Sequence, residues 1–335
     1  MPTLSVLMSV YNGSTYLKES IDSILDQTFT DFEFLIIDDC STDDSWQILQ
    51  DYADRDGRIR LLQNQENLGL TKSLNRGLAV AEGNYIARQD ADDVALPDRF
   101  QKQVQVLEQQ PEVVLVSCEM EWIDAAGQSL GSMQRSCQAD LVPWHLLFYN
   151  HVGGHSQVLY RRQAALTAGG YDEARRYSQD YDLWSRLTKQ GKIVILPEFL
   201  QLQRIHGQAI SAQKKTEQEA LSLAQTRKNI ANLIGEELSE EELRALRGFW
   251  IVPVYWYYFG DVVLSREKAT MIQTRLRQLY QAFVQQDALT SDSLKREIRQ
   301  LIRQRYMDWL PHLGFRKHFM LKLQIFIYGL TWLSR

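Results

Sequence analysis

The stretch that decides the fold is Asn-Tyr-Ile-Ala-Arg-Gln-Asp-Ala-Asp-Asp, residues 84–93. Its first half reads as a short β-strand, and three carboxylates follow at the C-terminal end of that strand. Three such charges repel one another unless a cation lies among them. Hard divalent ions such as Mg²⁺ or Mn²⁺ prefer oxygen ligands and neutralise charge on a phosphorylated leaving group. The stretch therefore predicts a metal site, and the alternative is that the acids cap a helix beginning near Pro97.

Strand-like and helix-like runs alternate around this stretch, which is typical of an α/β domain with a largely parallel sheet. The expected strands are residues 4–10, 32–37, 59–62 and 85–88. The expected helices are one that carries Leu17, Ile21, Ile24 and Leu25 on one face, and residues 46–53 and 70–81. Ser14 is the expected cap of the first helix, and Ser41 or Thr42 that of the second. Ligands of such open sheets bind outside the carboxyl ends of the strands. The polar loops at 11–13, 38–39 and 90–93 should therefore converge on one rim.

Composition narrows the class of protein. The chain has 335 residues, 44% of them apolar, which is enough for one large domain and a smaller one. A formal charge of −5 argues against general nucleic-acid affinity. The charge is uneven, because residues 1–60 carry 12 acids and 4 bases whereas residues 295–335 carry 9 bases and 2 acids.

Cysteine usage and hydropathy bear on the compartment. Cys40, Cys118 and Cys137 form no paired framework, which indicates a reducing compartment. The first residues lead directly into a strand pattern, so no signal peptide is expected. The longest apolar stretches, 250–264 and 321–333, are shorter than the ~20 residues that span a bilayer. A soluble or surface-bound protein is expected.

Six motifs follow one another along the chain: Ser9-Val10-Tyr11-Asn12-Gly13, Ile36-Ile37-Asp38-Asp39-Cys40-Ser41-Thr42-Asp43, Asn67-Leu68-Gly69, Asp90-Ala91-Asp92-Asp93, Gly169-Gly170-Tyr171-Asp172 and Gln179-Asp180-Tyr181-Asp182-Leu183-Trp184. In this order they closely resemble the signatures of family 2 glycosyltransferases, over about residues 3–212. The resemblance implies the α/β GT-A fold, a Rossmann-like mixed sheet flanked by helices. It also implies transfer of a sugar from a nucleotide-diphosphate donor with inversion at the anomeric carbon.

The donor contacts are implied residue by residue. Tyr11, with Asn12 beside it, matches the position that packs against the nucleobase, while Asp38 and Asp39 match those that reach base and ribose. An aromatic face stacks on a pyrimidine, and a carboxylate accepts hydrogen bonds from a ring N–H or a ribose hydroxyl. The alternatives are an amphipathic turn residue for Tyr11 and helix capping for the two acids.

The resemblance places Asp90 on the ribose side and Asp92 on the metal, Mn²⁺ or Mg²⁺, with Asp93 as a further candidate ligand. Arg204 and His206 match a late Arg-x-His element near the diphosphate. His206 would ligate the metal or bond a phosphate. The alternative for both is an ordinary surface or core residue.

Asp180 matches the catalytic base, which takes the proton of the acceptor hydroxyl as its oxygen attacks the anomeric carbon. It opens a helix-like run with a buried apolar stripe, and its alternative role is simple N-capping. His155 lies in a segment resembling the strand behind the acceptor cleft, and it would touch the acceptor or act structurally.

Two positions depart from the family pattern. Gln179 stands where an acid commonly precedes the base, which leaves acceptor contacts to an amide. The Arg-Asn pair often seen before the metal loop reads Leu74-Asn75-Arg76 here, so Lys72 or Arg76 would supply the missing positive charge.

The last third of the chain has another character. From about Thr216 the sequence turns to helices rich in Gln, Glu, Arg and Leu, so we expect a GT-A catalytic domain over 1–215 and a helical domain over 216–335. The end mixes aromatic residues with Arg and Lys, which suits contact with anionic lipid. The alternative is a subdomain that packs on the catalytic core or on a second copy in a homo-oligomer.

The expected function is an inverting, metal-dependent glycosyltransferase at the cytoplasmic side of the plasma membrane. It would move a sugar, with UDP the expected carrier, to a hydroxyl of a lipid-linked or polysaccharide acceptor in cell-surface glycan synthesis. A sugar-nucleotide nucleotidyltransferase is an alternative, but residues 10–14 lack its Gly- and Arg-rich phosphate loop. Another is a catalytically silent interaction protein, against which the joint presence of Asp92 and Asp180 argues.

Overall fold

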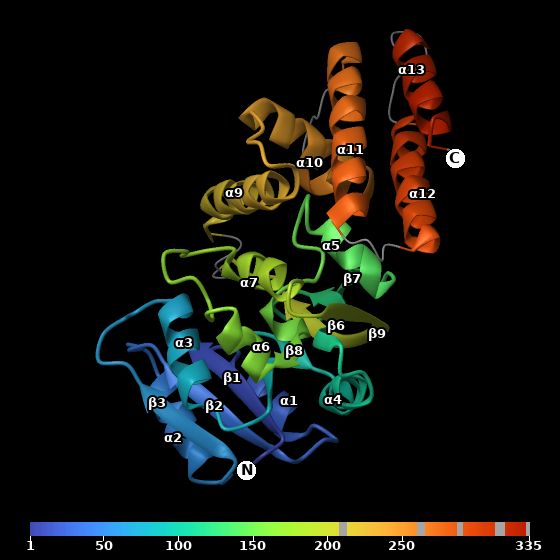
Figure 1. Cartoon of the computed structure of the whole chain (residues 1–335). Helices are drawn as coiled ribbons and strands as arrows, with labels where there is room; N and C mark the ends of the chain where they lie inside the picture. Colours follow the sequence, from blue (N-terminus) through green and yellow to red (C-terminus); the bar gives the residue numbers. More distant parts are fainter. Residues whose placement is uncertain (208–212, 260–264, 287–290, 312–318, 333–335) are drawn as a thin grey trace. The chain divides into compact units, whose positions relative to one another are not determined.

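The computed structural model describes residues 1–207, 213–259, 265–286, 291–311 and 319–332, and for 252–259 and 319 only the backbone (Figure 1). The chain divides into two compact units. The first comprises Met1–Val142 and His151–Leu221, and the second comprises Pro143–Asn150 and Ser222–Arg335. The domain boundary expected near residue 215 stays a prediction. In the structure the division lies a few residues later, and the short segment 143–150 belongs to the helical unit.

The first unit alternates strands and helices along the chain. In order these are β1 (Leu4–Val10), α1 (Leu17–Leu25), β2 (Phe32–Asp38), α2 (Ser45–Ala53), β3 (Ile59–Gln63), α3 (Leu70–Val80), β4 (Tyr85–Arg88), β5 (Val94–Ala95), α4 (Arg99–Gln109), β6 (Val113–Ile123), β7 (Ser129–Met133), η1 (Ala139–Leu141), η2 (His155–Gln157), β8 (Leu159–Arg161), α6 (Arg162–Thr167), α7 (Gln179–Leu187) and β9 (Lys192–Arg204). The chain crosses between the units within α5 (Val142–His145), between Asn150 and His151, and within α9 (Lys215–Ile234). The expected strands and helices of residues 4–88 are confirmed, with ends that differ by at most one residue.

The described strands join in a nine-stranded mixed sheet of order β3-β2-β1-β4-β8-β6-β9-β5, with β7 paired to β6. The strands of the first half run parallel, and β8 enters antiparallel between β4 and β6. Val10 lies opposite Asp38 in the register of β1 and β2, so the two strands end at the same level. The loops that follow them therefore start side by side.

The core of this unit follows from the sequence pattern. Strands β1 and β2 are buried along nearly their whole length, as expected of parallel strands covered on both faces. In α1 the buried positions Leu17, Ile21 and Ile24 recur at helical spacing. Helix α3 comes so close to the sheet that a side chain at Gly77 would collide with Leu7.

The expected helix caps are wrong. Helix α1 starts at Leu17, and the backbone N–H of Ser14 donates to Asp43 instead. Helix α2 follows Asp44, while Ser41 and Thr42 bond the preceding loop. The hydroxyls of Ser41 and Thr42 hold one loop against another, and that use competes with capping.

The second unit contains α10 (Glu240–Phe259), α11 (Arg266–Gln286), α12 (Asp292–Trp309) and α13 (Phe319–Leu330), drawn in orange and red in Figure 1. Its core holds Trp250, Trp309 and Trp332, and the indole N–H groups of the last two are hydrogen-bonded within the unit. None of the helices described here has the combined length and hydropathy that a bilayer crossing requires.

Candidate active site

The loops after β1 and β2 are tied to each other by short hydrogen bonds. The backbone N–H of Asn12 donates to Ser41 Oγ at 3.0 Å, and Asn12 Oδ1 accepts from the backbone N–H of Thr42 at 2.8 Å. Asn12 has φ 52°, a left-handed conformation that Asn tolerates better than most residues. The Asn12 side chain therefore shapes the rim of the sheet.

Tyr11 and Asp38 occupy this rim in different ways. The Tyr11 side chain is 53% exposed, which leaves an aromatic face open to a ligand. Asp38 is fully buried at the end of β2, and its carboxylate accepts weak hydrogen bonds from the Ser41 N–H and from Gln63 Nε2.

The carboxylate of Asp39 is engaged by protein donors. It accepts from Asn64 Nδ2 at 2.6 Å and from the backbone N–H groups of Leu68 and Gly69 at 2.9 and 2.8 Å. Gly69, at φ 84°, is the residue from which α3 starts. Asp39 thus holds the loop that leads into α3, and the Asn67-Leu68-Gly69 motif marks the partner of this carboxylate.

The loop after β4 is fixed at its first acid. The guanidinium of the fully buried Arg88 lies 2.7 Å from the Asp90 carboxylate. The backbone N–H of Asp90 donates to Ser156 Oγ, and its carbonyl accepts from Ser20 Oγ. Asp90 is therefore held by the end of its own strand β4 and by two elements distant in sequence, η2 and α1.

The other two acids of this loop meet the end of β9. The backbone N–H of Arg204 donates to Asp93 Oδ1 at 3.0 Å, and His206 Nε2 lies 2.9 Å from Asp92 Oδ2. Asp93 is 3% exposed, whereas the Asp92 side chain is 32% exposed. Asp92 is thus the more outward-facing of the two acids, and His206, whose side chain is 11% exposed, lies against it.

Arg204 itself is buried, and its side chain donates to protein groups. Its Nε donates to the Asp92 carbonyl at 3.1 Å, one terminal nitrogen donates to the Asp124 carbonyl, and the other lies 2.6 Å from Glu19 Oε2. The guanidinium also lies over the ring of Tyr16, which contacts His206 on the same side. Arg204 therefore positions the acidic loop.

Two carboxyl groups of the acidic loop, those of Asp92 and Asp93, have a raised pKa. Burial, together with the neighbouring Asp90 carboxylate, raises the pKa of Asp92, although the bond to His206 opposes this. Burial raises the pKa of Asp93 more strongly, and the charges of Asp92 and Asp90 add to the effect. A cation among these oxygens would relieve both effects.

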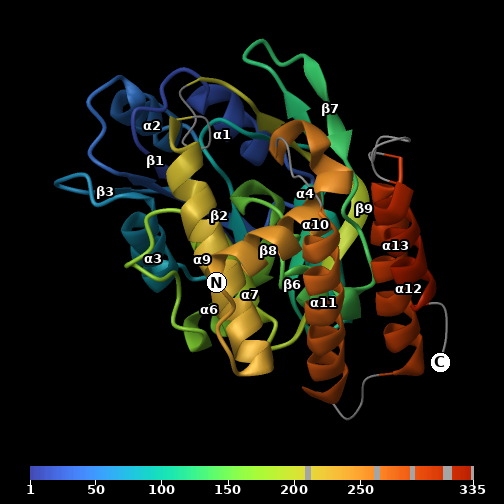
Figure 2. The same cartoon turned by 90° about the horizontal axis from the view of Figure 1, so that it is seen from above.

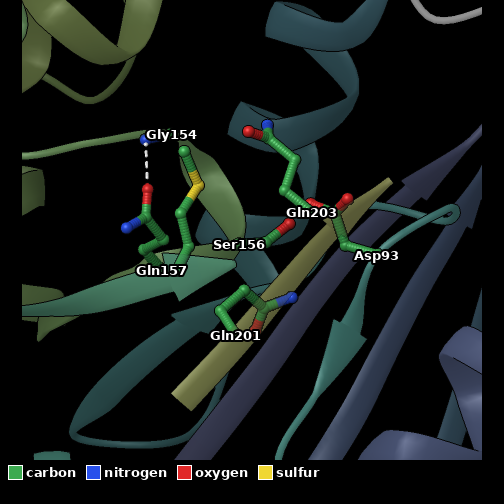
Figure 3. A pocket seen from close by; sticks show the side chains of 7 residues that line it. Asp93, Gly154, Ser156, Gln157, Gln201 and Gln203 are labelled. Atoms are coloured by element: carbon green, nitrogen blue, oxygen red, sulfur yellow. Dashed lines mark hydrogen bonds between the residues drawn. The ribbon is translucent and has the colours of Figure 1, made fainter. Parts of the chain in front are cut away.

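A buried polar layer supports the loop from behind. Arg99 Nη1 donates to the side chains of Gln89 and Gln201, and Gln89 Nε2 donates to the Asp93 carbonyl. Figure 3 shows Asp93, Ser156, Gln201 and Gln203 around a small crevice in this layer. These hydrogen bonds hold the loop that carries Asp93 from its buried side.

Asp180 lies in the first turn of α7, as predicted, and its Oδ1 accepts from the N–H of Tyr181 at 2.8 Å. Burial raises the pKa of Asp180, Asp90 contributes in the same direction, and His155 opposes it. His155 is 8% exposed, and its buried Nε2 has no hydrogen-bond partner among the described residues. The expected base and acceptor residue therefore lie close to the acidic loop. His155 belongs to η2, so the predicted strand is confined to β8.

The residues at the two departures from the family pattern have different surroundings. The side chain of Asn75 both donates to and accepts from the backbone of Tyr171, which fixes the Gly-Gly-Tyr-Asp loop. Arg76 donates to the Gln63 carbonyl, so it is held beside β3. Lys72 is exposed on the first turn of α3, and Gln179 is buried at the start of α7.

Sequence reasoning brought out the acids of the rim but missed their supports, which are Arg88, Ser156, Glu19 and Tyr16. Arg88 had one available signal, because a charged residue ending a buried strand directly before an acidic loop needs a nearby counter-charge. The other three lie on distant segments, and no local pattern marks them.

The chain matches the family model "Glycosyl transferase family 2" over residues 5–135. An uncharacterized glycosyltransferase of Haemophilus influenzae is 31% identical over 258 residues, which cover 71% of this chain and 77% of that protein. The amylovoran biosynthesis glycosyltransferase AmsE of Erwinia amylovora is 30% identical over 58% of this chain and 74% of that protein.

Two solved structures share the fold at 16% sequence identity. The S. aureus TarS 1–349 complex with UDP has a TM-score of 0.57 and covers 96% of this chain and 88% of that one. The mannosyltransferase PcManGT of Pyrobaculum calidifontis, in complex with GDP-Man and Mn²⁺, has a TM-score of 0.56 and covers 99% of this chain and 86% of that one. The sheet is that of the GT-A fold. The family model and the relative from Haemophilus influenzae show that the chain belongs to glycosyl transferase family 2 and is a glycosyltransferase.

Proposed function

We propose that this glycosyltransferase moves a sugar from a nucleoside diphosphate, UDP being the expected carrier, to an acceptor hydroxyl with inversion at the anomeric carbon. The observation that carries the proposal is the convergence of Asp180 and His155 beside Asp90, whose carboxylate acts in the direction of a higher pKa on both side chains. A base beside a metal-type acidic loop is the arrangement that such a transfer needs.

The acidic loop suits a divalent cation. Its donors are carboxylate oxygens with one imidazole, and Asp92 and His206 would hold the ion on the open side. Asp93 is buried and accepts the Arg204 N–H, so we assign it to fixing the loop, with Arg204 in the same positioning role. When bound, Mn²⁺ or Mg²⁺ would neutralise charge on the departing nucleoside diphosphate.

The donor would lie along the rim formed by the loops after β1 and β2. The exposed ring of Tyr11 would stack on the base, and Asp38 would accept a hydrogen bond from base or ribose. Asp90 would face the ribose side, and the exposed Lys72 would supply positive charge. The UDP complex of TarS and the GDP-Man complex of PcManGT support a nucleotide-sugar donor.

Transfer requires a base with access to the acceptor. The acceptor oxygen would form a bond to the anomeric carbon, the bond to the diphosphate oxygen would break, and Asp180 would take the proton. The raised pKa of Asp180 suits this role, because it strengthens the carboxylate as a base. Through its unpartnered Nε2, His155 would hydrogen-bond the acceptor, and Gln179 would also contact the acceptor.

For the acceptor we propose a lipid-linked or polysaccharide hydroxyl on the cytoplasmic side of the membrane. The family relationship supports this, as does the similarity to AmsE, which is named for amylovoran biosynthesis.

The test compares Asp180→Asn with Asp51→Asn, an exposed acid of α2. We expect Asp180→Asn to lower turnover by about 10²–10⁴-fold, with nucleotide binding retained. Asp51→Asn should behave like the wild type. Equal turnover in both variants would refute the assignment of the base. A folded protein that binds no nucleotide diphosphate with any divalent metal would instead favour a silent interaction protein.

A further inference from the structure

Helix α13 exposes a row of large apolar residues in addition to those that it buries. Its exposed residues include Met320, Leu323, Phe326, Ile327 and Leu330, which are between 39% and 53% exposed. Spacings of three and four residues put them on one face of the helix. Lys322 is the one charged residue of α13.

Two polar residues of the same helix, Gln324 and Tyr328, turn toward α11. Gln324 Nε2 donates to the Arg266 carbonyl and to Thr270 Oγ1, and the Tyr328 hydroxyl lies 3.1 Å from Thr270 Oγ1. Thr331, just past the helix end, accepts from Gln273 Nε2. These polar side chains of α13 are thus hydrogen-bonded to α11, and the face of α13 that is exposed to solvent is apolar.

The position of α13 within its unit is tightly set. It lies beside α12 in both views (Figures 1 and 2), and a side chain at Gly329 would collide with Met307. Leu321 and Ile325 are buried on the inner side. The helix therefore has no freedom to turn its apolar face inward without breaking these contacts.

The aromatic residues near the end of the chain differ in their exposure. Trp309 and Trp332 are 1% and 6% exposed, so they belong to the core of the unit. Arg305 pairs with Asp308 and lies over Trp250. Neither tryptophan therefore faces solvent, whereas the five exposed apolar residues of α13 do.

We propose that the α13 stripe, defined as Met320, Leu323, Phe326, Ile327 and Leu330, inserts into the headgroup region of an anionic membrane. Positive charge lies at both edges of the stripe, with Lys322 next to Phe326 on one side and Arg266 bonded to Gln324 on the other. Apolar burial combined with basic residues is the condition for binding of this kind.

A second copy of the chain is a less suitable partner for the α13 stripe than a membrane, because the stripe is small. Twelve residues of helix are about 18 Å long, so a face about 10 Å wide offers roughly 200 Å². A stable dimer buries about 800 Å² on each partner. A lipid surface has no such threshold, since each inserted side chain adds to the partition free energy.

The proposal is independent of catalysis, although it would bring the enzyme to the lipid-linked acceptor proposed above. The test is co-sedimentation of the whole chain with vesicles of phosphatidylcholine containing about a quarter phosphatidylglycerol. The variant is Leu323→Gln with Ile327→Gln. Its control is Leu130→Gln with Leu166→Gln, two exposed leucines of the first unit.

We expect the wild type and the control to bind, and the α13 variant to bind about tenfold or more weakly. Raising the salt concentration should weaken wild-type binding, because Lys322 and Arg266 act through screened charge. Equal binding of both variants, or no wild-type binding, would overturn the proposal. So would a loss of dimer in the α13 variant by sedimentation velocity without lipid, which would assign the stripe to a second copy. Failure of the proposed transferase would appear in turnover and leave sedimentation unchanged.

Discussion

Two acidic clusters lie at the carboxyl end of one sheet, and they differ in how their charges are satisfied. After β2, the Asp39 carboxylate accepts three hydrogen bonds, two of them from backbone N–H groups. After β4, burial and mutual repulsion raise the pKa of Asp92 and Asp93. Adjacent acids in a sequence therefore mean two things: a carboxylate that holds a loop, or carboxylates that need a cation.

The largest expected difference between the two acidic clusters is the effect of a substitution on sugar transfer. Asp92→Asn should lower metal-dependent sugar transfer by at least about a hundredfold, because it removes an outward-facing ligand of the proposed cation. The measurement is turnover over a range of Mn²⁺ concentrations. Nearly normal turnover that saturates at the same Mn²⁺ concentration would remove Asp92 from the metal site.

The same pair of clusters should differ in the sign of a stability effect. Asp39→Asn turns an amide N–H₂ toward backbone donors, and we expect it to lower the free energy of unfolding by about 1–3 kcal/mol. Asp92→Asn, measured with EDTA, should leave stability unchanged or raise it, because it removes a repelling charge. Urea unfolding of the two matched variants checks this. Equal destabilisation by both would mean that the clusters are alike.

A pH series sharpens this difference. An acid whose folded pKa is raised adds stability below its unfolded pKa, and the gain is lost as pH rises through the folded pKa. Without metal, the wild type should therefore lose stability relative to Asp92→Asn as pH rises from about 3.9, the ordinary pKa of an unfolded Asp, through the raised pKa of Asp92 in the folded protein. Buried histidines such as His145 and His155 contribute equally to both proteins, so they cancel in the difference. A difference that does not vary with pH would contradict the raised pKa of Asp92.

The smallest effect concerns the support of the loop. Glu19→Gln removes the carboxylate that pairs with Arg204, which in turn bonds the Asp92 carbonyl and donates its N–H to Asp93. We expect Mn²⁺ affinity to fall several-fold, with donor affinity in EDTA unchanged. Lys18→Gln, a neighbouring change on α1, serves as the control. A fall in donor affinity without metal would assign Glu19 to the nucleotide side.

Much of the first unit was predictable because its information is local. Strands β1, β2 and β4 are short apolar runs that end in polar loops, and parallel pairing brings those loops to one rim. The contact of Gly13 with Ala91 shows the convergence directly, since a Cβ at Gly13 would lie 3.4 Å from that residue.

The supports of the site were not predictable, because they depend on pairings between distant segments. Arg204 and Glu19 are 185 positions apart, and Ser156 reaches Asp90 across 66. The exposure of the apolar face of α13 was equally unpredictable. The sequence shows which residues are apolar, but it does not show that α11 lies against the side that carries Gln324. Helix caps failed for a related reason, because Ser41 and Thr42 bond another loop.

The most direct test of the central claim, that the cluster after β4 and not the one after β2 holds the cation, is the metal dependence of UDP binding. Calorimetric titration of UDP with Mn²⁺ and with EDTA gives the ratio of the two affinities for the wild type, Asp92→Asn and Asp39→Asn. We predict a ratio well above one for the wild type, a ratio near one for Asp92→Asn, and a ratio close to the wild-type value for Asp39→Asn even if its overall affinity falls. A ratio that survives in Asp92→Asn and disappears in Asp39→Asn would contradict the assignment.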